Sequence, residues 1–336
     1  MLETLWFFLL GILFMAFVVM DGFDWGVGIV QPFLCRNAHD RQAAQATIGP
    51  FWDGNEVWLI AAGGTLYFAF PKLYAISFSG FYLPLMLLLW ILILRALALE
   101  LGHQWEQPLW QRFWHFVFAS SSSLIALVFG VALGNLIRGV PLDTTGYFLL
   151  PFWTNFSPRS SELGVFDGFT LVLGVYAVLL CAGHGLAWLE LKAEPELAHK
   201  AGQLLTRIWA IVLVCDGLVA GFTYWIQPRF FGANQWLSVL LGLGALTAWV
   251  VMRWLPRQRF LLSCLHLVGL LLACFCAMLP FGLLEAGSAS GIRLQDLAAP
   301  SGQLKLALFW WVPALGLVCG YFVFVHKKFW GRILSH

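Results

Sequence analysis

Two pairs of acidic residues stand in this sequence where apolar residues would be expected. Asp21 and Asp24 follow an apolar run of about sixteen residues, 5–20, and Asp53 and Glu56 lie in a second apolar stretch. The acids of each pair are three residues apart, so a helix places them on one face. Carboxyl groups kept away from water in this way can bind and release protons, which is the chemistry of proton uptake in membrane proteins.

The composition places these acids in an integral membrane protein. Of the 336 residues, 60% are hydrophobic and only 11% are charged, which is less than half the charged fraction of an ordinary soluble domain. The formal charge is only +2 and no run of Lys and Arg offers a surface for phosphate, so nucleic acid is excluded as a partner. The seven cysteines form no metal or haem-attachment pattern, and no metal site is expected.

Apolar stretches long enough to cross a bilayer are the elements that must position the acids. A spanning helix needs about twenty apolar residues, and prolines mark the breaks between the stretches. The sequence predicts nine spans, at 5–31, 48–70, 74–99, 113–138, 163–190, 202–227, 234–254, 259–284 and 304–326.

The distribution of Lys and Arg predicts the orientation, because these residues concentrate in cytoplasmic loops. With the N-terminus outside the cell, eleven fall inside: Arg36, Arg41, Arg112, Lys192, Lys200, Arg253, Arg257, Arg259, Lys327, Lys328 and Arg332. Six fall outside: Lys72, Arg138, Arg159, Arg229, Arg293 and Lys305. We therefore expect a periplasmic N-terminus and a cytoplasmic C-terminus.

This topology brings the polar residues of three spans to one side of the membrane. The first span runs inward, the second begins inside, and the third ends inside near Arg95 and Glu100. Five acids and one arginine then gather on the cytoplasmic side, as proton uptake from the cytoplasm requires. A purely structural ion pair between Asp24 and Arg95 is the alternative that the residues leave open.

Three further polar residues lie inside predicted spans. His184 and His266 have the ring nitrogens of haem ligands, but a lone histidine in a membrane more often bonds to a neighbouring helix. Asp216 lies deep in the sixth span and should have a buried partner or carry a proton. The sequence assigns no role to these three residues.

Several motifs, in order along the whole chain, resemble subunit II of the cytochrome bd quinol oxidases. They are DGFDWGVG (21–28), WDGNEVWL (52–59), FAFPKLYAISFSGFYLPL (68–85), LGNLIRGVP (133–141), PSGQLKL (300–306) and WGR (330–332). The length and the glutamate at position 56 are closer to the shorter, cyanide-insensitive branch.

The resemblance implies an all-α membrane fold in one domain, 1–336. It divides into a four-helix bundle at 1–140, a second at 160–285 and a peripheral last helix at 303–326. The family's acidic positions correspond to Asp21, Asp24 and Asp53, and its arginine and acid at the end of the third span to Arg95 and Glu100. The connection after the sixth span is short, so a quinone seat known from longer members does not carry over.

The same resemblance implies the cofactors, partners and location. Two b-type haems and a d-type or replacement b-type haem belong to subunit I, the expected partner, with quinol as the substrate. This chain then has no catalytic residue or haem of its own and supplies assembly and a proton route. Membrane lipid is a further expected partner, the family admits a small accessory single-helix subunit, and the expected location is the bacterial inner (plasma) membrane.

Two other functions fit the residues alone. A secondary transporter would use the same acids to couple protons to a solute, although transporters usually show matching broken spans in their two halves. The only recurring motif, DGF, stands at 21–23 and again at 167–169. The predicted topology places the two copies at different depths in the membrane, so they are not equivalent positions of a repeat. A scaffold subunit would use the acids only for ion pairs.

Overall fold

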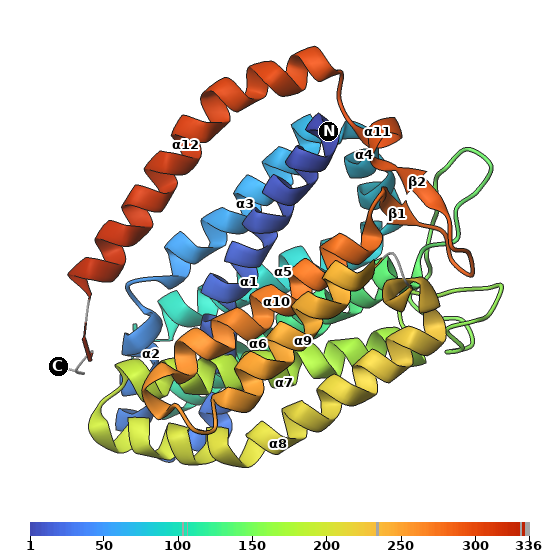
Figure 1. Cartoon of the computed structure of the whole chain (residues 1–336). Coiled ribbons are helices and arrows are strands. Elements are labelled where there is room, and N and C mark those ends of the chain that lie inside the picture. The colour runs from blue at the N-terminus through green and yellow to red at the C-terminus, as the bar shows by residue number, and fades with distance from the viewer. Residues whose placement is uncertain (103, 106, 233–234, 330, 333–336) are drawn as a thin grey trace.

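The computed structural model describes the whole chain except residues 103, 106, 233, 234, 330 and 333–336. It is an all-α membrane fold with one small antiparallel sheet (Figure 1). The helices are α1 (Leu2–Leu34), α2 (Ala38–Ile48), α3 (Trp52–Ala69), α4 (Pro71–Gly80), α5 (Tyr82–Leu101), α6 (Pro108–Arg138), α7 (Gly168–Lys192), α8 (Pro195–Ile226), α9 (Trp236–Val251), α10 (Arg259–Met278), α11 (Leu294–Leu297) and α12 (Ser301–Lys328). Strands β1 (Phe281–Leu284) and β2 (Gly291–Arg293) pair with each other.

Seven of the described helices are long and apolar enough to cross a membrane: α1, α5, α6, α7, α8, α10 and α12. An eighth crossing is reached if α3 and α4 count as one span, but the two meet at a bend of 117°. The remaining candidate, α9, has only 16 residues. The chain is therefore a multi-pass membrane protein, and the predicted count of nine spans stays a prediction.

The predicted third span, 74–99, was wrong at its beginning. Pro71 starts α4, which ends at Gly80, and α5 begins only at Tyr82. Hydropathy could not locate this break because residues on both sides of it are mainly apolar, although α4 is less so than α5. The second predicted span also begins late, at Trp52, because residues 38–48 form a separate helix capped by the side chain of Asn37.

The eighth predicted span, 259–284, continued too far. Helix α10 ends at Met278, and the apolar residues after Pro280 form β1 instead. A proline lacks the N–H group that would continue the helix, and the partner strand β2 lies only a short turn away. The sixth span begins earlier than expected, because Pro195 occupies the first turn of α8, where its missing N–H costs nothing.

Helix α1 lies at the centre of the fold because its glycines permit close crossings. A Cβ atom on Gly26 would stand 2.0 Å from the carbonyl oxygen of Cys181 in α7, and one on Gly28 would stand 2.2 Å from the hydroxyl of Ser122 in α6. Small residues of this kind let membrane helices pack backbone to backbone. Helix α1 therefore packs closely against both α6 and α7, and the division into bundles at 1–140 and 160–285 stays a prediction.

The positions of the glycines and of the acids along α1 place the two acids away from α7. At 100° per residue, Asp21 and Asp24 lie about 150° around the helix from Gly22 and Gly26. Helix α7 therefore covers the glycine face, and the acids face α3 and α5 instead. The DGFDWGVG motif combines a packing face and a polar face in one helix.

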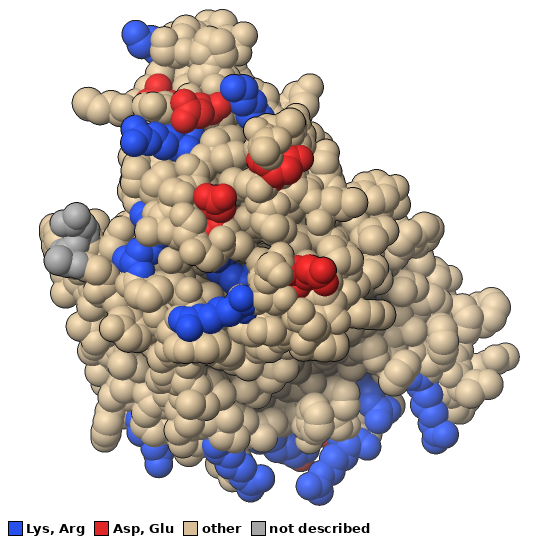
Figure 2. All heavy atoms as spheres, turned by 90° about the vertical axis from the view of Figure 1, so that its right-hand side faces the viewer, with Lys and Arg blue, Asp and Glu red and all other residues tan. Residues whose placement is uncertain are grey.

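Helix α12 arches along the outside of the other helices, beside α3 (Figure 1). Its inner face is fixed by aromatic contacts, and the indole of Trp6 in α1 donates a hydrogen bond to the carbonyl oxygen of Leu304. Figure 2 shows the face of the molecule that carries the long loops: acidic and basic side chains alternate over its upper part, whereas Lys and Arg predominate along its lower edge. The predicted orientation of the termini remains a prediction.

Candidate functional site: a buried carboxylate cluster

Arg95 of α5 is the centre of a buried polar cluster. Its Nη2 atom lies 2.7 Å from Oδ1 of Asp21 in α1, and its Nη1 atom lies 2.8 Å from Oε1 of Glu56 in α3. The side chains of Arg95 and Asp21 are fully buried. One guanidinium therefore joins three helices whose polar residues the sequence had placed on one side of the membrane.

Asp24 completes the cluster from the next turn of α1. Its Oδ2 atom lies 3.6 Å from Nη2 of Arg95 and accepts a 2.9 Å hydrogen bond from the side-chain amide of Asn55 in α3. The same amide donates to the carbonyl oxygen of Met20, also at 2.9 Å. Asn55 is fully buried and ties α3 to α1 at the level of the acids. We call Asp21, Asp24, Asn55, Glu56 and Arg95 the Arg95 cluster.

The exposure of the acids increases from the buried end of the cluster on α1 to the first turn of α3. Asp24 is fully buried, the side chain of Glu56 is 28% exposed, and Asp53, one turn before Glu56, is exposed. Glu100, five residues after Arg95 on α5, is also exposed. The structure thus gathers four of the six predicted residues around one guanidinium and places Asp53 and Glu100 at the surface.

The cluster contains more acid than base. Three carboxyl groups face one guanidinium, so the cluster has a charge of −2 when every group is ionised. Three polar atoms of the cluster are buried without a hydrogen-bond partner among the described residues: Oδ1 of Asp24, Oδ1 of Asn55 and Nε of Arg95. Because buried charge is costly unless it is paired, binding of one or two protons stabilises the cluster, and Oδ1 of Asp24 is an open position for one of them.

Comparison with known proteins decides the family. The model of the family described as cytochrome bd terminal oxidase subunit II matches residues 2–329. The chain belongs to this family. The resemblance seen in the sequence is confirmed, and this bd-type subunit II is part of an oxidoreductase complex; the secondary-transporter alternative does not describe it. Trp330 of the WGR motif lies outside the described residues.

Individual relatives agree over most of the chain. The sequence is 30% identical over 371 residues to cytochrome bd-I ubiquinol oxidase subunit 2 of Escherichia coli (strain K12), covering 99% of this chain and 95% of the relative. It is 34% identical over 213 residues to cytochrome bd ubiquinol oxidase subunit 2 of Bacillus subtilis (strain 168), covering 63% and 60%. The solved bd oxidase of Geobacillus thermodenitrificans matches with a TM-score of 0.77 at 15% identity, covering 98% of both chains, and supports the fold.

The two buried histidines of this bd-type subunit II do not fit a haem. Nε2 of His184 lies 2.9 Å from the carbonyl oxygen of Val19, and its Nδ1 lies 2.7 Å from the hydroxyl of Ser263. His266 places Nδ1 2.8 Å from the carbonyl oxygen of Ala245 and Nε2 3.4 Å from Asp216. Each nitrogen therefore faces a protein atom where an iron would have to bind. Within the described part of the chain, no three His, Cys, Asp or Glu side chains form a metal-binding group.

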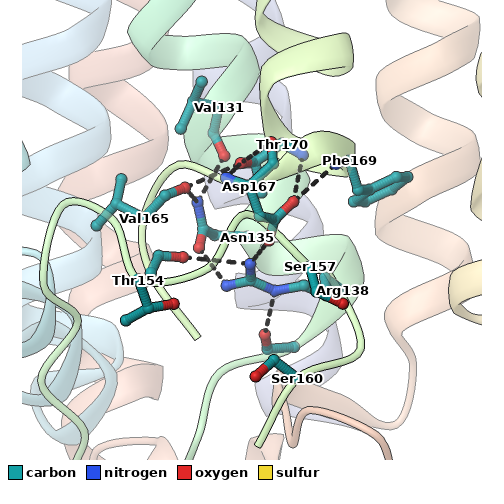
Figure 3. A network of polar contacts seen from close by, with 12 residues as sticks. Val131, Asn135, Arg138, Thr154, Ser157, Ser160, Val165, Asp167, Phe169 and Thr170 are labelled. Atoms are coloured by element: carbon teal, nitrogen blue, oxygen red, sulfur yellow. Dashed lines mark hydrogen bonds and ion pairs between the residues drawn. The ribbon is translucent and has the colours of Figure 1, made fainter. Parts of the chain in front are cut away.

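A second buried arginine, Arg138, lies in a network of polar contacts that the sequence did not predict (Figure 3). Arg138, at the end of α6, forms an ion pair with Asp167 and donates to Oδ1 of Asn135 at 2.6 Å and to the carbonyl oxygen of Gly164 at 3.2 Å. Asp167 in turn caps α7 through the amide of Thr170 at 2.9 Å. Arg138 was counted only as one of the six cations on the outer side of the membrane, which does not predict its burial: it is 2% exposed. We call Asn135, Arg138, Asp167 and Thr170 the Arg138 cluster.

A sequence signal for the Arg138 cluster was present in two places. LGNLIRGVP places Asn135 and Arg138 three residues apart at a helix end, and the DGF at 167–169 begins a helix with a capping residue. The second DGF is thus an N-cap, which agrees with rejecting it as an internal repeat. Asn55 was also missed, although a polar residue between Asp53 and Glu56 in an apolar stretch indicates a buried partner.

Proposed function

We propose that this terminal oxidase subunit conducts protons from the cytoplasm to its haem-bearing partner, subunit I, in the bacterial inner membrane. The observation that carries the proposal is the surplus of acid in the Arg95 cluster: three carboxyl groups around one guanidinium, at the buried end of a series of acids whose exposure increases toward the surface. A structural ion pair needs only one acid for each arginine.

The complex would oxidise two quinols and use their four electrons, with four protons, to reduce one O₂ to two water molecules. In the partner, haem supplies the electron transfer to oxygen. Quinol releases its protons on the outer side, whereas the protons for water enter through this chain from the inner side. The reaction would then build a proton gradient without a pump.

Each acid has a defined part in this route. Asp53, at the first turn of α3, and Glu100, at the end of α5, collect protons at the surface. Glu56 passes them inward because one of its oxygens already lies against Arg95. Asp21 and Asp24 hold the proton at the buried end, where Oδ1 of Asp24 has no other partner among the described residues.

Arg95 and Asn55 position these carboxyl groups and limit their charge. The guanidinium reduces the cost of an ionised carboxylate, so a proton can leave one acid before another arrives. Its five N–H donors have fixed directions, and they hold acids of α1 and α3 within 3.6 Å of one cation. Asn55 fixes the orientation of Asp24.

A scaffold function is the second candidate, since Arg95 joins α1, α3 and α5 and its loss would loosen all three helices. The substitution Asp24→Asn separates the two functions. Asn keeps the shape and can still accept the hydrogen bond from Asn55, but it cannot carry a proton. Asp296→Asn, at an exposed acid far along the chain, is the matched control.

We expect Asp24→Asn to assemble with normal haem content and to consume oxygen at least about tenfold more slowly, an increase of about 1.4 kcal/mol in the barrier. Proton uptake from the inner side after an oxygen pulse should slow by the same factor. Asp296→Asn should match the unmodified enzyme. If Asp24→Asn instead loses haem content while each assembled complex keeps its full rate, the cluster is a scaffold.

A further inference from the structure

A second group of polar side chains lies between helices α7, α8 and α10, away from the Arg95 cluster. It consists of Tyr176, Asp216 and His266. The hydroxyl of Tyr176 donates a hydrogen bond to Oδ1 of Asp216. Nε2 of His266 lies 3.4 Å from the same oxygen, and the side chains of Asp216 and His266 are 7% and 1% exposed. Oδ2 of Asp216 is buried with no hydrogen-bond partner among the described residues.

The group lies well inside two helices that are long and apolar enough to cross a membrane. Asp216 is ten residues before the end of α8, and Tyr176 is eight residues after the start of α7. At 1.5 Å per residue these positions are about 15 Å and about 12 Å from the helix ends. An isolated carboxylate at this depth costs about 2.5–3.5 kcal/mol on insertion scales, so the charge of Asp216 requires compensation.

The hydrogen bonds of His266 show where its protons are. Nδ1 lies 2.8 Å from the carbonyl oxygen of Ala245, which can only accept, so Nδ1 carries a hydrogen. Turning the ring over would place a carbon at that distance, which is closer than C–H···O contacts of about 3.3–3.6 Å. Nε2 has no hydrogen-bond partner among the described residues and lies 3.4 Å from Oδ1 of Asp216. A neutral His266 would therefore place a bare lone pair beside an ionised carboxylate, and one additional proton removes this conflict.

The neighbours of this group that the structure describes are thiols, an indole and a backbone carbonyl, none of them a formal charge. The thiols of Cys215 and Cys274 lie near Tyr176, and the indole of Trp249 packs 5.0 Å from the ring of His266. Helix α9 contributes the carbonyl of Ala245 and contains no titratable residue between 236 and 251. Neutralisation must come from within the group itself.

We propose that Asp216 and His266 form a second proton-binding site that holds one proton, either as an imidazolium beside a carboxylate or as a carboxylic acid beside a neutral imidazole. Tyr176 is a positioning residue whose hydroxyl fixes Oδ1 of Asp216. In both forms the site has no net charge, so it can keep a proton in the membrane interior. It goes beyond the proposed inlet, because it shares no residue with the Arg95 cluster.

The test measures the protons directly in the assembled oxidase. Nitrogen-15 spectra of histidine-labelled enzyme distinguish an imidazolium from a neutral ring, and infrared difference spectra distinguish a carboxylic acid from a carboxylate. Subtraction of the His266→Gln and Asp216→Asn enzymes identifies the signals of the two residues. We expect exactly one protonated partner: an imidazolium with a carboxylate, or a neutral ring with a carboxylic acid.

A neutral ring together with a carboxylate would overturn the proposal, and so would an imidazolium together with a carboxylic acid. Tyr176→Phe is the control, because it removes the hydroxyl and leaves the proton pair, so the single-proton signal should remain. Asp216→Asn should assemble normally, since its amide can accept from Tyr176 and donate to Nε2 without an added proton. If one variant does not assemble, the other still identifies the pair.

Discussion

The Arg95 and Arg138 clusters place the same kind of group, a buried arginine with one or more carboxylates, at two ends of one molecule, but they differ in composition. Arg138 has one acid, Asp167, and every nitrogen of its guanidinium has a partner. Arg95 has three acids, and its Nε atom has no partner among the described residues. The Arg138 cluster has one acid for its one cation and a partner for each guanidinium nitrogen, whereas the Arg95 cluster has more acids than cations and a guanidinium nitrogen without a partner in the described part of the chain.

Under the proposed function, this difference separates a structural ion pair from a proton-handling site. In the Arg138 cluster, Oδ1 of Asp167 accepts from the amides of Phe169 and Thr170 while Oδ2 faces the arginine, so a proton arriving there would break existing bonds. In the Arg95 cluster a proton on Asp24 breaks none at Oδ1 and reduces the net charge. The ratio of acids to cations, more than burial itself, predicts the function.

Removal of Arg95 should have the largest effect. Arg95→Leu leaves three carboxyl groups without their cation, and loss of one partner of a buried ion pair costs about 3–5 kcal/mol. We expect a lower yield of assembled complex, a lower thermal midpoint and at least about tenfold slower oxygen consumption in what remains. Arg95→Lys, which keeps the charge but not the forked donors, should retain more of both. A variant Arg95→Leu with normal midpoint and rate would show that the cluster neither holds the fold nor conducts protons.

Removal of Arg138 should change stability alone. Arg138→Leu leaves Asp167 buried and unpaired, at a similar cost of about 3–5 kcal/mol, but each assembled complex should keep its rate of oxygen consumption. Adding Asp167→Asn to Arg138→Leu removes the unpaired charge and should recover part of the thermal midpoint. A slow enzyme with an unchanged midpoint would erase the contrast between the two clusters.

The sequence predicted the Arg95 cluster well because two independent patterns agree there. Helical spacing pairs Asp21 with Asp24, and the Lys and Arg distribution puts them on the same side as Arg95. Neither pattern states how far a residue lies from the surface, so Asp53 and Glu100 were placed with the buried acids although they are exposed. Side-chain depth depends on how adjacent helices cross, and glycines such as Gly26 set that crossing.

The Arg138 cluster could not be predicted from charge counting. A cation just after an apolar stretch is usually a solvated loop residue, and only the folded chain brings the loop before α7 over Arg138 (Figure 3). Apolar β1 was likewise read as helix, because a short apolar run does not distinguish a strand from the end of a helix. Asp216 was expected either to have a buried partner or to carry a proton, and the structure places Tyr176 and His266 beside it.

The smallest effect is expected at the surface end of the route. Asp53→Asn leaves the buried cluster intact, so haem content and the thermal midpoint should not change. It removes one negative charge that attracts protons to the mouth of the route, and such fields raise local concentration by about tenfold or more. We expect oxygen consumption to fall by about twofold to tenfold at low salt.

The dependence of oxygen consumption on salt concentration tests whether Asp53 acts through its charge. Salt screens exposed charges over a distance of about 10 Å at 0.1 M, so added salt should slow the unmodified enzyme more than the Asp53→Asn enzyme until the two rates converge. Asp296→Asn should follow the unmodified enzyme at every salt concentration. Unchanged oxygen consumption with normal haem content at low salt would remove Asp53 from the route, and the contrast between the two arginine clusters would then depend on the buried acids alone.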